Sequence, residues 1–348
     1  MTAYPTNPEN AWILELSKKW NSNPVFSVKP MLEIGNSIIN KLLRLPQTLS
    51  KHPNDNSTLH SIESPPTFRS TPQKSDIIQD LIKGKNPNYY DFVNRYGNPD
   101  VEYPIFLASM FSACEGNPWE ENRRLYGALE IEATSHGLGS CNIEIPFIKP
   151  QEQIESEEGW TSSWTPPGAI SHTHMDFYGS TQYFIHISGE KLWLMWPPTE
   201  RNLEWFSLLH KQPWTPHRTL ECIEKLEGLQ LLYNDSPLTP FILKPNTLHA
   251  CISLSSCIHS GMRLWSLSSF DVSSLLMEWG IEWIKGAHGL NRSELIDEAD
   301  SLAYEISMWS VLVKQNKNYG NLSQLKNRLK ELTESLRQIR NKLEVAPP

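Results

Sequence analysis

Cysteine is scarce in this chain and is not arranged in pairs. The 348 residues include only five cysteines, Cys114, Cys141, Cys222, Cys251 and Cys257. No two of them form a Cys-x-x-Cys motif. An odd number of cysteines without paired spacing argues against a disulfide scaffold and against a structural zinc knuckle.

Positive charge is also in short supply. Lysine and arginine total 31 against 39 aspartates and glutamates, which gives a formal net charge of -8. Proteins that hold nucleic acid through phosphate contacts carry an excess of positive charge. We therefore expect no direct DNA binding. A basic partner, such as a cationic peptide, is compatible with this balance.

Long apolar runs are missing as well. No segment approaches the roughly 20 apolar residues that a membrane-spanning helix needs. The first residues, MTAYPTNPEN, lack the basic and apolar regions of a signal peptide. The sequence thus predicts an intracellular protein without membrane contact, in the nucleus or the cytoplasm.

The composition divides the chain into four regions. Apolar residues at helical spacing predict an N-terminal helical segment over 1–45. Residues 46–75 are rich in proline, serine and threonine and predict a flexible linker. Residues 76–270 are expected to form a β-rich domain, and residues 271–348 a C-terminal helical region.

Short apolar or alternating runs separated by turn residues dominate the β-rich domain. This pattern favours a mainly β core, an antiparallel sandwich or barrel, with helices on either side. The neighbouring runs TQYFIHIS and KLWLMW are joined through Gly189 and Glu190. We expect the two runs to pair as a hairpin.

The last segment carries a heptad pattern of apolar residues. Its members are Leu322, Leu325, Leu329, Leu332, Leu336, Ile339 and Leu343. Such a stripe is typical of a coiled-coil helix. Two alternatives follow: the helix docks on its own domain, or the chain self-associates through it.

One polar cluster within the β-rich domain suggests a metal site. His174 and Asp176 form a His-x-Asp element, and residues two apart on a strand point to the same face. His249, farther along the chain, is a candidate third ligand. Two histidines and one carboxylate are the ligand set of non-haem Fe(II) oxygenases. The alternative is that these histidines are ordinary structural side chains.

Two further residues could serve the same site. Lys191 follows Asp176 on the next expected strand. A buried lysine needs an anion, and a dicarboxylate co-substrate would supply one. Otherwise Lys191 is a surface lysine beside the turn. Ser171 could add a hydroxyl donor to the same carboxylate.

The run HMDFYGSTQYFIHISGEKLWLMWPPTERN resembles the core of a JmjC domain. The run PFILKPNTLHACISL is similar to the later segment of that family, which carries its last metal ligand. The resemblance covers residues 166–270 and is closest to the histone lysine demethylase branches. It implies a double-stranded β-helix, a jelly-roll of the cupin type, inside the β-rich domain.

The resemblance also implies an activity. Fe(II) would be held by His174, Asp176 and His249, and 2-oxoglutarate would bind Lys191 with help from Ser171. Oxidative decarboxylation of 2-oxoglutarate by dioxygen would then hydroxylate a protein or peptide, a histone tail being one candidate. On an N-methyl group, hydroxylation leads to demethylation in chromatin. Protein hydroxylation is the close alternative, since the chain lacks cysteine-rich reader modules.

The chain departs from the JmjC pattern at three places. Phe184 stands where many members have a tyrosine or an asparagine that reaches 2-oxoglutarate, a loss of about 1 kcal/mol. Ser171 replaces a common threonine, and the residues before His249 are unusual. None of these changes removes a metal ligand, so an active enzyme is favoured. A catalytically degenerate interaction protein is the alternative.

Overall fold

The computed structural model describes residues 8–22, 29–53, 58–61, 73–83, 88–94, 96–97, 100–116, 124–132, 153–155, 159–210, 215, 217–286, 292–316 and 321–345. Part of the expected linker over 46–75 lies outside these residues. The helices are α1 (Ala11–Ser22), α2 (Lys29–Leu43), α3 (Lys74–Ile82), α4 (Tyr103–Cys114), α5 (Glu200–His210), α6 (Arg218–Lys225), α7 (Phe270–Gly286), α8 (Arg292–Gln315) and α9 (Leu322–Val345). None of these helices is both long and apolar enough to cross a membrane.

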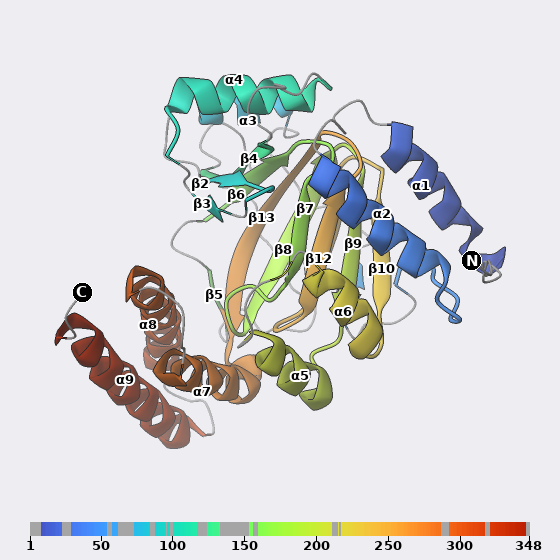
Figure 1. Ribbon diagram of the computed structural model, residues 1–348. Helices are drawn as coiled ribbons and strands as arrows, with labels where there is room; N and C mark the ends of the chain where they lie inside the picture. The colour runs from blue at the N-terminus through green and yellow to red at the C-terminus, as the bar shows by residue number, and fades with distance from the viewer. Residues whose placement is uncertain are drawn as a thin grey trace.

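The strands form two antiparallel sheets that pack together as a sandwich (Figure 1). The strands are β1 (Leu59–Ser61), β2 (Asn88–Asp91), β3 (Tyr96–Gly97), β4 (Tyr126–Glu132), β5 (Gln153–Glu155), β6 (Thr161–Thr165), β7 (Ile170–His174), β8 (Ser180–Ser188), β9 (Lys191–Trp196), β10 (Gln230–Asn234), β11 (Thr239–Leu243), β12 (Leu248–Ser253) and β13 (Cys257–Ser266). The larger sheet has the order β1-β11-β8-β13-β6-β4-β2-β3, with β5 added to β13. The smaller sheet has the order β10-β9-β12-β7.

The expected hairpin between TQYFIHIS and KLWLMW is wrong. β8 pairs with β11 and β13 in the larger sheet, whereas β9 pairs with β10 and β12 in the smaller one. Gly189 carries the chain across with a φ of 90°, and a Cβ there would lie 2.2 Å from the Ser256 carbonyl oxygen. Only glycine fits this crossing point. The same runs therefore belong to opposite walls of the sandwich.

Strand β9 is buried on both faces, which explains why its sequence KLWLMW does not alternate with polar residues. Leu192 and Leu194 join the apolar cluster under α1, α2 and α6. Trp193 and Met195 face the space between the sheets, beside Phe241 of β11. Burial of each such side chain contributes about 1.5–3 kcal/mol. On the far side, α3 and α4 cover the larger sheet.

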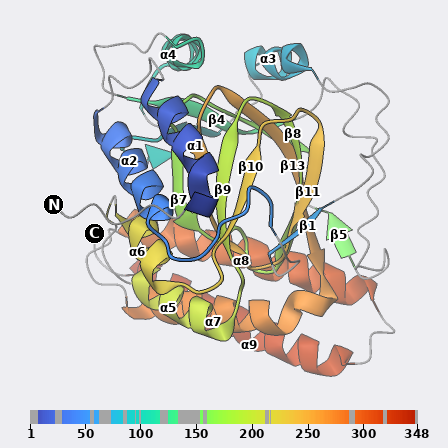
Figure 2. The same cartoon turned by 90° about the vertical axis from the view of Figure 1, so that its right-hand side faces the viewer.

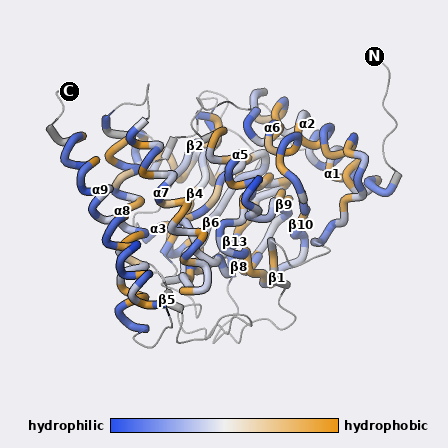
Figure 3. Tube along the Cα trace, turned by 90° about the horizontal axis from the view of Figure 1, so that it is seen from below, coloured by the Kyte–Doolittle hydropathy of each residue, from blue (hydrophilic) through white to orange (hydrophobic). Residues whose placement is uncertain are grey.

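The C-terminal helices α7, α8 and α9 gather on one side of the sheets (Figure 2). The heptad residues Leu325, Leu329, Leu332, Leu336 and Ile339 are all buried in this cluster. Figure 3 shows the resulting alternation of hydrophobic and hydrophilic segments along α9. The helix thus docks on its own chain, as in the first of the two alternatives. Self-association through this helix stays a prediction.

Candidate metal centre

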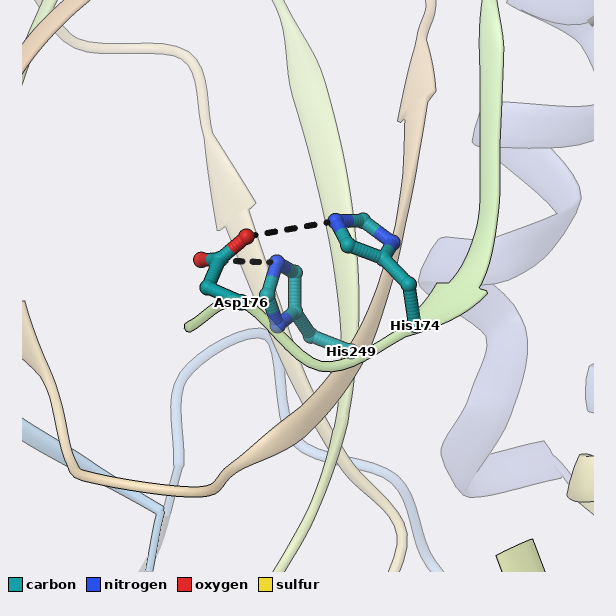
Figure 4. Close-up of side chains that lie close together, drawn as sticks. All are labelled: His174, Asp176 and His249. Atoms are coloured by element: carbon teal, nitrogen blue, oxygen red, sulfur yellow. Dashed lines mark ion pairs between the residues drawn. The ribbon is translucent and has the colours of Figure 1, made fainter. Parts of the chain in front are cut away.

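His174 and His249 lie opposite each other on neighbouring strands. β7 and β12 pair antiparallel with these two residues in register. Asp176 lies just beyond the end of β7 and not on the strand itself, so the expected strand alternation is not what aims it. The ligand atoms of the three residues all lie within 4.8 Å of one another (Figure 4). The three predicted metal ligands therefore form one group.

The carboxylate of Asp176 stands between the two imidazoles. One oxygen lies 3.6 Å from His174 Nε2, and the other lies 3.6 Å from His249 Nε2. The two ring centroids are 4.3 Å apart. Figure 4 shows both Nε2 atoms directed at the carboxylate. Two nitrogen atoms and one oxygen thus converge on a single point.

The other ring nitrogen of each histidine is held by the backbone. His174 Nδ1 lies 2.7 Å from the carbonyl oxygen of His172, and His249 Nδ1 lies 3.1 Å from that of Thr247. A carbonyl oxygen only accepts, so each Nδ1 must carry the proton. In the neutral form of each imidazole, Nε2 then carries a free lone pair. Metal-binding histidines are oriented in the same way.

The electrostatics of the group suit a divalent cation. Burial, with the nearby His174, lowers the pKa of His249 to about 4, so this imidazole is neutral at pH 7. Burial alone would raise the pKa of Asp176, but His249, His174 and Arg263 outweigh it and lower that pKa. The group therefore offers a neutral imidazole at His249 and an ionised carboxylate at Asp176, both of which suit a metal ion.

The group is open on one side. The His174 side chain is 42% exposed, whereas that of His249 is 3% exposed. Three protein ligands leave coordination positions for small molecules, as in catalytic sites of zinc and non-haem iron. The residues thus fit a metal ion that also binds a substrate.

A turn after Asp176 is fixed by residues from distant parts of the chain. Glu305 Oε2 on α8 accepts the backbone N–H of Tyr178 at 3.2 Å. Asn246 Oδ1 accepts the N–H of Gly179 at 2.7 Å. Gly179 has a φ of 81°, and a Cβ there would lie 2.1 Å from Ser273 Oγ. Residues of the C-terminal helices thus hold the backbone next to Asp176. This role of the helices was not predicted from the sequence.

All six predicted site residues line one cavity of about 350 Å³ between the sheets. They are Ser171, His174, Asp176, Phe184, Lys191 and His249. They come from β7, the turn after it, β8, β9 and β12. The fold therefore brings together residues that span about a quarter of the sequence.

Lys191 is buried in this cavity, so the alternative of a surface lysine is wrong. Lys191 is only 3% exposed, and its Nζ donates to His259 Nδ1 at 3.2 Å. Burial, together with the charge of Lys191, keeps the pKa of His259 well below its usual value, so His259 can accept. Among the residues that the structure describes, no carboxylate forms an ion pair with Lys191. A buried ammonium group is costly unless it is paired or hydrogen-bonded, and the printed hydrogen-bond partner of Lys191 is His259.

Ser171 and Phe184 line the same cavity from opposite sheets. Ser171, on β7, is half-buried beside Cys251 of β12. Phe184, on β8, packs against Trp193, Phe241 and His259 with ring centroids 5.2–5.5 Å apart. It brings an apolar wall to the cavity and no hydrogen-bond donor.

Two other histidines lie near His174 in the sequence, His172 and His186, and both make contacts outside the metal group. His172 is buried, and its carbonyl holds His174 while its ring lies 3.2 Å from Thr219 Oγ1. His186 Nε2 donates to the carbonyl of Gly189 at 2.9 Å, at the crossing between the sheets. Neither belongs to the metal group.

Comparison of the chain with models of protein families finds no match. A search of curated proteins finds no significant match either. The site itself must therefore carry the functional argument, and what it establishes is a His-Asp-His group suited to a metal ion inside an antiparallel β-sandwich.

Proposed function

We propose that this protein is an Fe(II)- and 2-oxoglutarate-dependent dioxygenase of the JmjC type that acts on a protein substrate. The observation that carries the proposal is the shared cavity. It holds the His-Asp-His group together with Lys191, a buried cation that has no carboxylate partner in the described part of the chain. A dicarboxylate that chelates a metal at one end needs both.

The strand register is compatible with a dicarboxylate that bridges these two features. Lys191 is opposite Ser253 on β12, whereas His249 is opposite Met195 on β9. Four residues of strand therefore separate them, which is about 13 Å. Both features line the same cavity. We propose that a five-carbon dicarboxylate spans the gap between the Lys191 ammonium and the metal ligands.

The strand order supports the finer fold assignment. From β6 to β13, the strands distribute over two sheets with the orders β11-β8-β13-β6 and β10-β9-β12-β7. Repeated passage between two four-stranded walls is the arrangement of a jelly-roll. We therefore assign residues 161–266 to a double-stranded β-helix. The remaining strands of the larger sheet extend one wall of it.

Each residue of the cavity has a part in this proposal. His174, Asp176 and His249 would hold Fe(II), which with 2-oxoglutarate and dioxygen supplies the oxidising power. Lys191 would donate to the distal carboxylate of 2-oxoglutarate, and Ser171 would add a hydroxyl. Phe184 and Trp193 form an apolar wall that excludes water. His259 keeps the lysine ammonium in place.

The reaction outcome depends on the substrate atom that faces the iron. An N-methyl group leads to demethylation with release of formaldehyde, of which a histone tail is the first candidate. A carbon atom of a side chain leads to a stable alcohol. Phe184 favours a second candidate function, a catalytically degenerate scaffold, because it removes a donor that many JmjC proteins use.

A turnover experiment tests the proposal. The protein, reconstituted with Fe(II), is supplied with 2-oxoglutarate, dioxygen and a panel of methylated and unmethylated peptides, and succinate and formaldehyde are measured. We expect substrate-dependent succinate that disappears in His174→Ala and in Asp176→Ala. An exposed histidine far from the cavity, replaced in His52→Ala, serves as the control and should leave turnover unchanged. Persistent succinate in both ligand variants would refute the assignment.

The scaffold alternative has its own readout. The anaerobic complex of Fe(II) and 2-oxoglutarate has a weak visible absorption band. The band should form with the wild-type protein. If neither the metal nor 2-oxoglutarate binds, the scaffold function is the better account.

A further inference from the structure

Two turns flank the metal group, one after its carboxylate and one before its buried histidine. In the first turn, the N–H of Ser180 donates to the carbonyl oxygen of Phe177 at 3.0 Å. In the second, the N–H of Thr247 donates to the carbonyl oxygen of Lys244 at 3.3 Å. Each segment is therefore a four-residue turn that is closed by a hydrogen bond between its first and last residues.

The third residue of each turn has a left-handed backbone. Gly179 has a φ of 81°, and Asn246 has a φ of 60°. A positive φ at this position is typical of a type II turn, which takes glycine or asparagine there. Pro245 stands at the second position of the later turn, where its fixed φ is favoured. The residues before His249, which are unusual for a JmjC domain, thus encode a specific turn.

The two left-handed residues are hydrogen-bonded to each other. Asn246 Oδ1 accepts the N–H of Gly179 at 2.7 Å, across 67 positions of the chain. We call this contact the inter-turn bond. Asn246 Nδ2 lies 3.5 Å from Ser273 Oγ on α7, and the Ser273 hydroxyl itself donates to the carbonyl oxygen of Ser269. The Ser273 oxygen therefore faces the amide nitrogen, which leaves the amide oxygen directed at Gly179.

The inter-turn bond is buried and closely packed. Asn246 is 5% exposed. A Cβ on Gly179 would lie 2.1 Å from Ser273 Oγ and 2.5 Å from Trp309 Cζ2. Ser269 Oγ donates to the carbonyl oxygen of Gly179 at 3.1 Å. Both polar groups of the Gly179 backbone are thus held by side chains from other parts of the chain.

The strand ladder places only two of the three metal ligands. His174 and His249 are opposite each other on β7 and β12. Asp176 follows the end of β7, so its position depends on the turn after it. Gly179 comes three residues after Asp176, and Asn246 comes three residues before His249. The inter-turn bond therefore links the segment of one ligand directly to the segment of another.

We propose that Asn246 is a positioning residue for the metal group. Its amide ties the turn after Asp176 to the turn before His249, and it sets the separation of these two ligands before a metal ion binds. Ligands that are already in place lose less conformational freedom on binding, so the affinity for the metal ion is higher. The inference needs only the metal group and does not depend on which reaction the bound metal ion supports.

Variants of Asn246 separate the hydrogen bond from the shape of the backbone. Asn246→Gly keeps the left-handed turn and removes the amide. Asn246→Asp keeps an oxygen that can accept the N–H of Gly179. Leu238, between β10 and β11, is another non-glycine residue with a positive φ, 59°, and it does not line the metal cavity. Leu238→Gly is therefore a matched control for the loss of a side chain at a left-handed position.

Metal affinity is measured on the full-length chain by absorption titration with Co(II), whose visible bands also report the geometry of the ligands. We expect Asn246→Gly to bind Co(II) about tenfold more weakly than wild type and with altered bands, as for other residues behind metal ligands. Asn246→Asp should recover most of the affinity and the wild-type bands. Leu238→Gly should match wild type in both. Thermal unfolding checks that each variant is folded.

A second measurement uses the wild-type chain alone. If the inter-turn bond and metal binding favour the same arrangement, each must strengthen the other. Diamagnetic Zn(II) should then slow the hydrogen exchange of the Gly179 amide, which NMR measures. The reference is the Leu238 amide, which donates to the carbonyl oxygen of His186 at 2.6 Å. We expect Zn(II) to slow exchange at Gly179 by a larger factor than at Leu238.

Each of three results would overturn the inference. They are a wild-type chain that does not bind Co(II), an unchanged Co(II) affinity in Asn246→Gly, and an equal effect of Zn(II) on the two amides. If Asn246→Gly does not fold, the exchange measurement decides. A failure of the proposed function looks different, because the metal ions would then bind as described here while no succinate forms from 2-oxoglutarate.

Discussion

Lys191 and His259 stand on strands of opposite sheets, and Lys191 Nζ donates to His259 Nδ1 across the cavity at 3.2 Å. The histidine is neutral, because burial and the lysine charge keep its pKa well below the usual value. A neutral acceptor fixes the ammonium without cancelling its charge. In the function proposed above, this pair is the anchor for the distal carboxylate of 2-oxoglutarate.

Removal of the acceptor should loosen this anchor. We expect His259→Leu to raise the KM for 2-oxoglutarate about tenfold and to change kcat little, since one hydrogen bond to a charged group is lost. His259→Asn keeps an acceptor and should recover most of the affinity. Steady-state succinate formation measures both. A fall in kcat with an unchanged KM would contradict the anchor role.

A hydroxyl at position 184 should strengthen co-substrate binding. Phe184 is 8% exposed and lines the cavity with Lys191. One added hydrogen bond is worth about 1 kcal/mol, so Phe184→Tyr should lower the KM for 2-oxoglutarate about fivefold. Phe241→Tyr, a matched change in the same aromatic cluster but not at the cavity, should have no such effect. An unchanged KM in Phe184→Tyr would show that another group already binds this carboxylate.

Glu305 should control metal affinity from a distance. It accepts the N–H of Tyr178, two residues after Asp176, so Glu305→Leu frees the turn that carries this ligand. We expect a 10- to 100-fold loss of Co(II) affinity, a range of about the size found for residues behind metal ligands. Glu305→Gln retains an acceptor oxygen and should bind Co(II) nearly as well as wild type. Titration with Co(II), followed by absorption, measures the affinity. Thermal unfolding checks that the variants are folded.

Helix α9 should contribute to stability through its buried seam. Leu332 is buried among α7 and α8, so Leu332→Ala should lower the free energy of unfolding by about 2–5 kcal/mol. Lys330 lies on the exposed face of the helix. Lys330→Ala should therefore change the free energy of unfolding by less than about 0.5 kcal/mol. Urea denaturation gives both values. Light scattering should show the same solution mass for all three proteins, and dissociation in Leu332→Ala would instead place the seam in an interface.

Acid should destabilise the metal-free protein before it protonates most carboxylates. Burial is the main cause that lowers the pKa of both His186 and His259. Below about pH 6.5 the unfolded chain takes up protons that the folded chain refuses, so stability is lost as the pH falls. We therefore expect the free energy of unfolding to fall progressively as the pH is lowered through about 6.5. His186→Gln should flatten the slope, and an unchanged slope would contradict a buried neutral His186.

The metal group could be predicted from the sequence because its signals are local. His174 and Asp176 are two residues apart, and Lys191 follows on the next apolar run. His249 needed the surrounding run PFILKPNTLHACISL as a second clue. The alternating runs also predicted the antiparallel sandwich, since the period of a strand is visible within a few residues.

Strand pairing and a second cavity could not be predicted in the same way. A run such as KLWLMW indicates that its strand is buried on both faces. It does not indicate which strands lie beside it. The contact between His259 and Lys191 crosses from one sheet to the other, so no local pattern in the sequence reveals it. Glu298 and Trp279 lie on separate helices, and only the packing of α7 and α8 brings them to this second cavity, which His174 and Asp176 also line.

The contact between Glu305 and Tyr178 spans 127 positions of the chain. During synthesis, the strands of the sandwich leave the ribosome long before α8 does. The hydrogen bond from Tyr178 to Glu305, which holds the turn after Asp176, therefore cannot form until Glu305 has been synthesised. We therefore expect a chain that ends before α8 to hold a metal ion less tightly than the full-length chain.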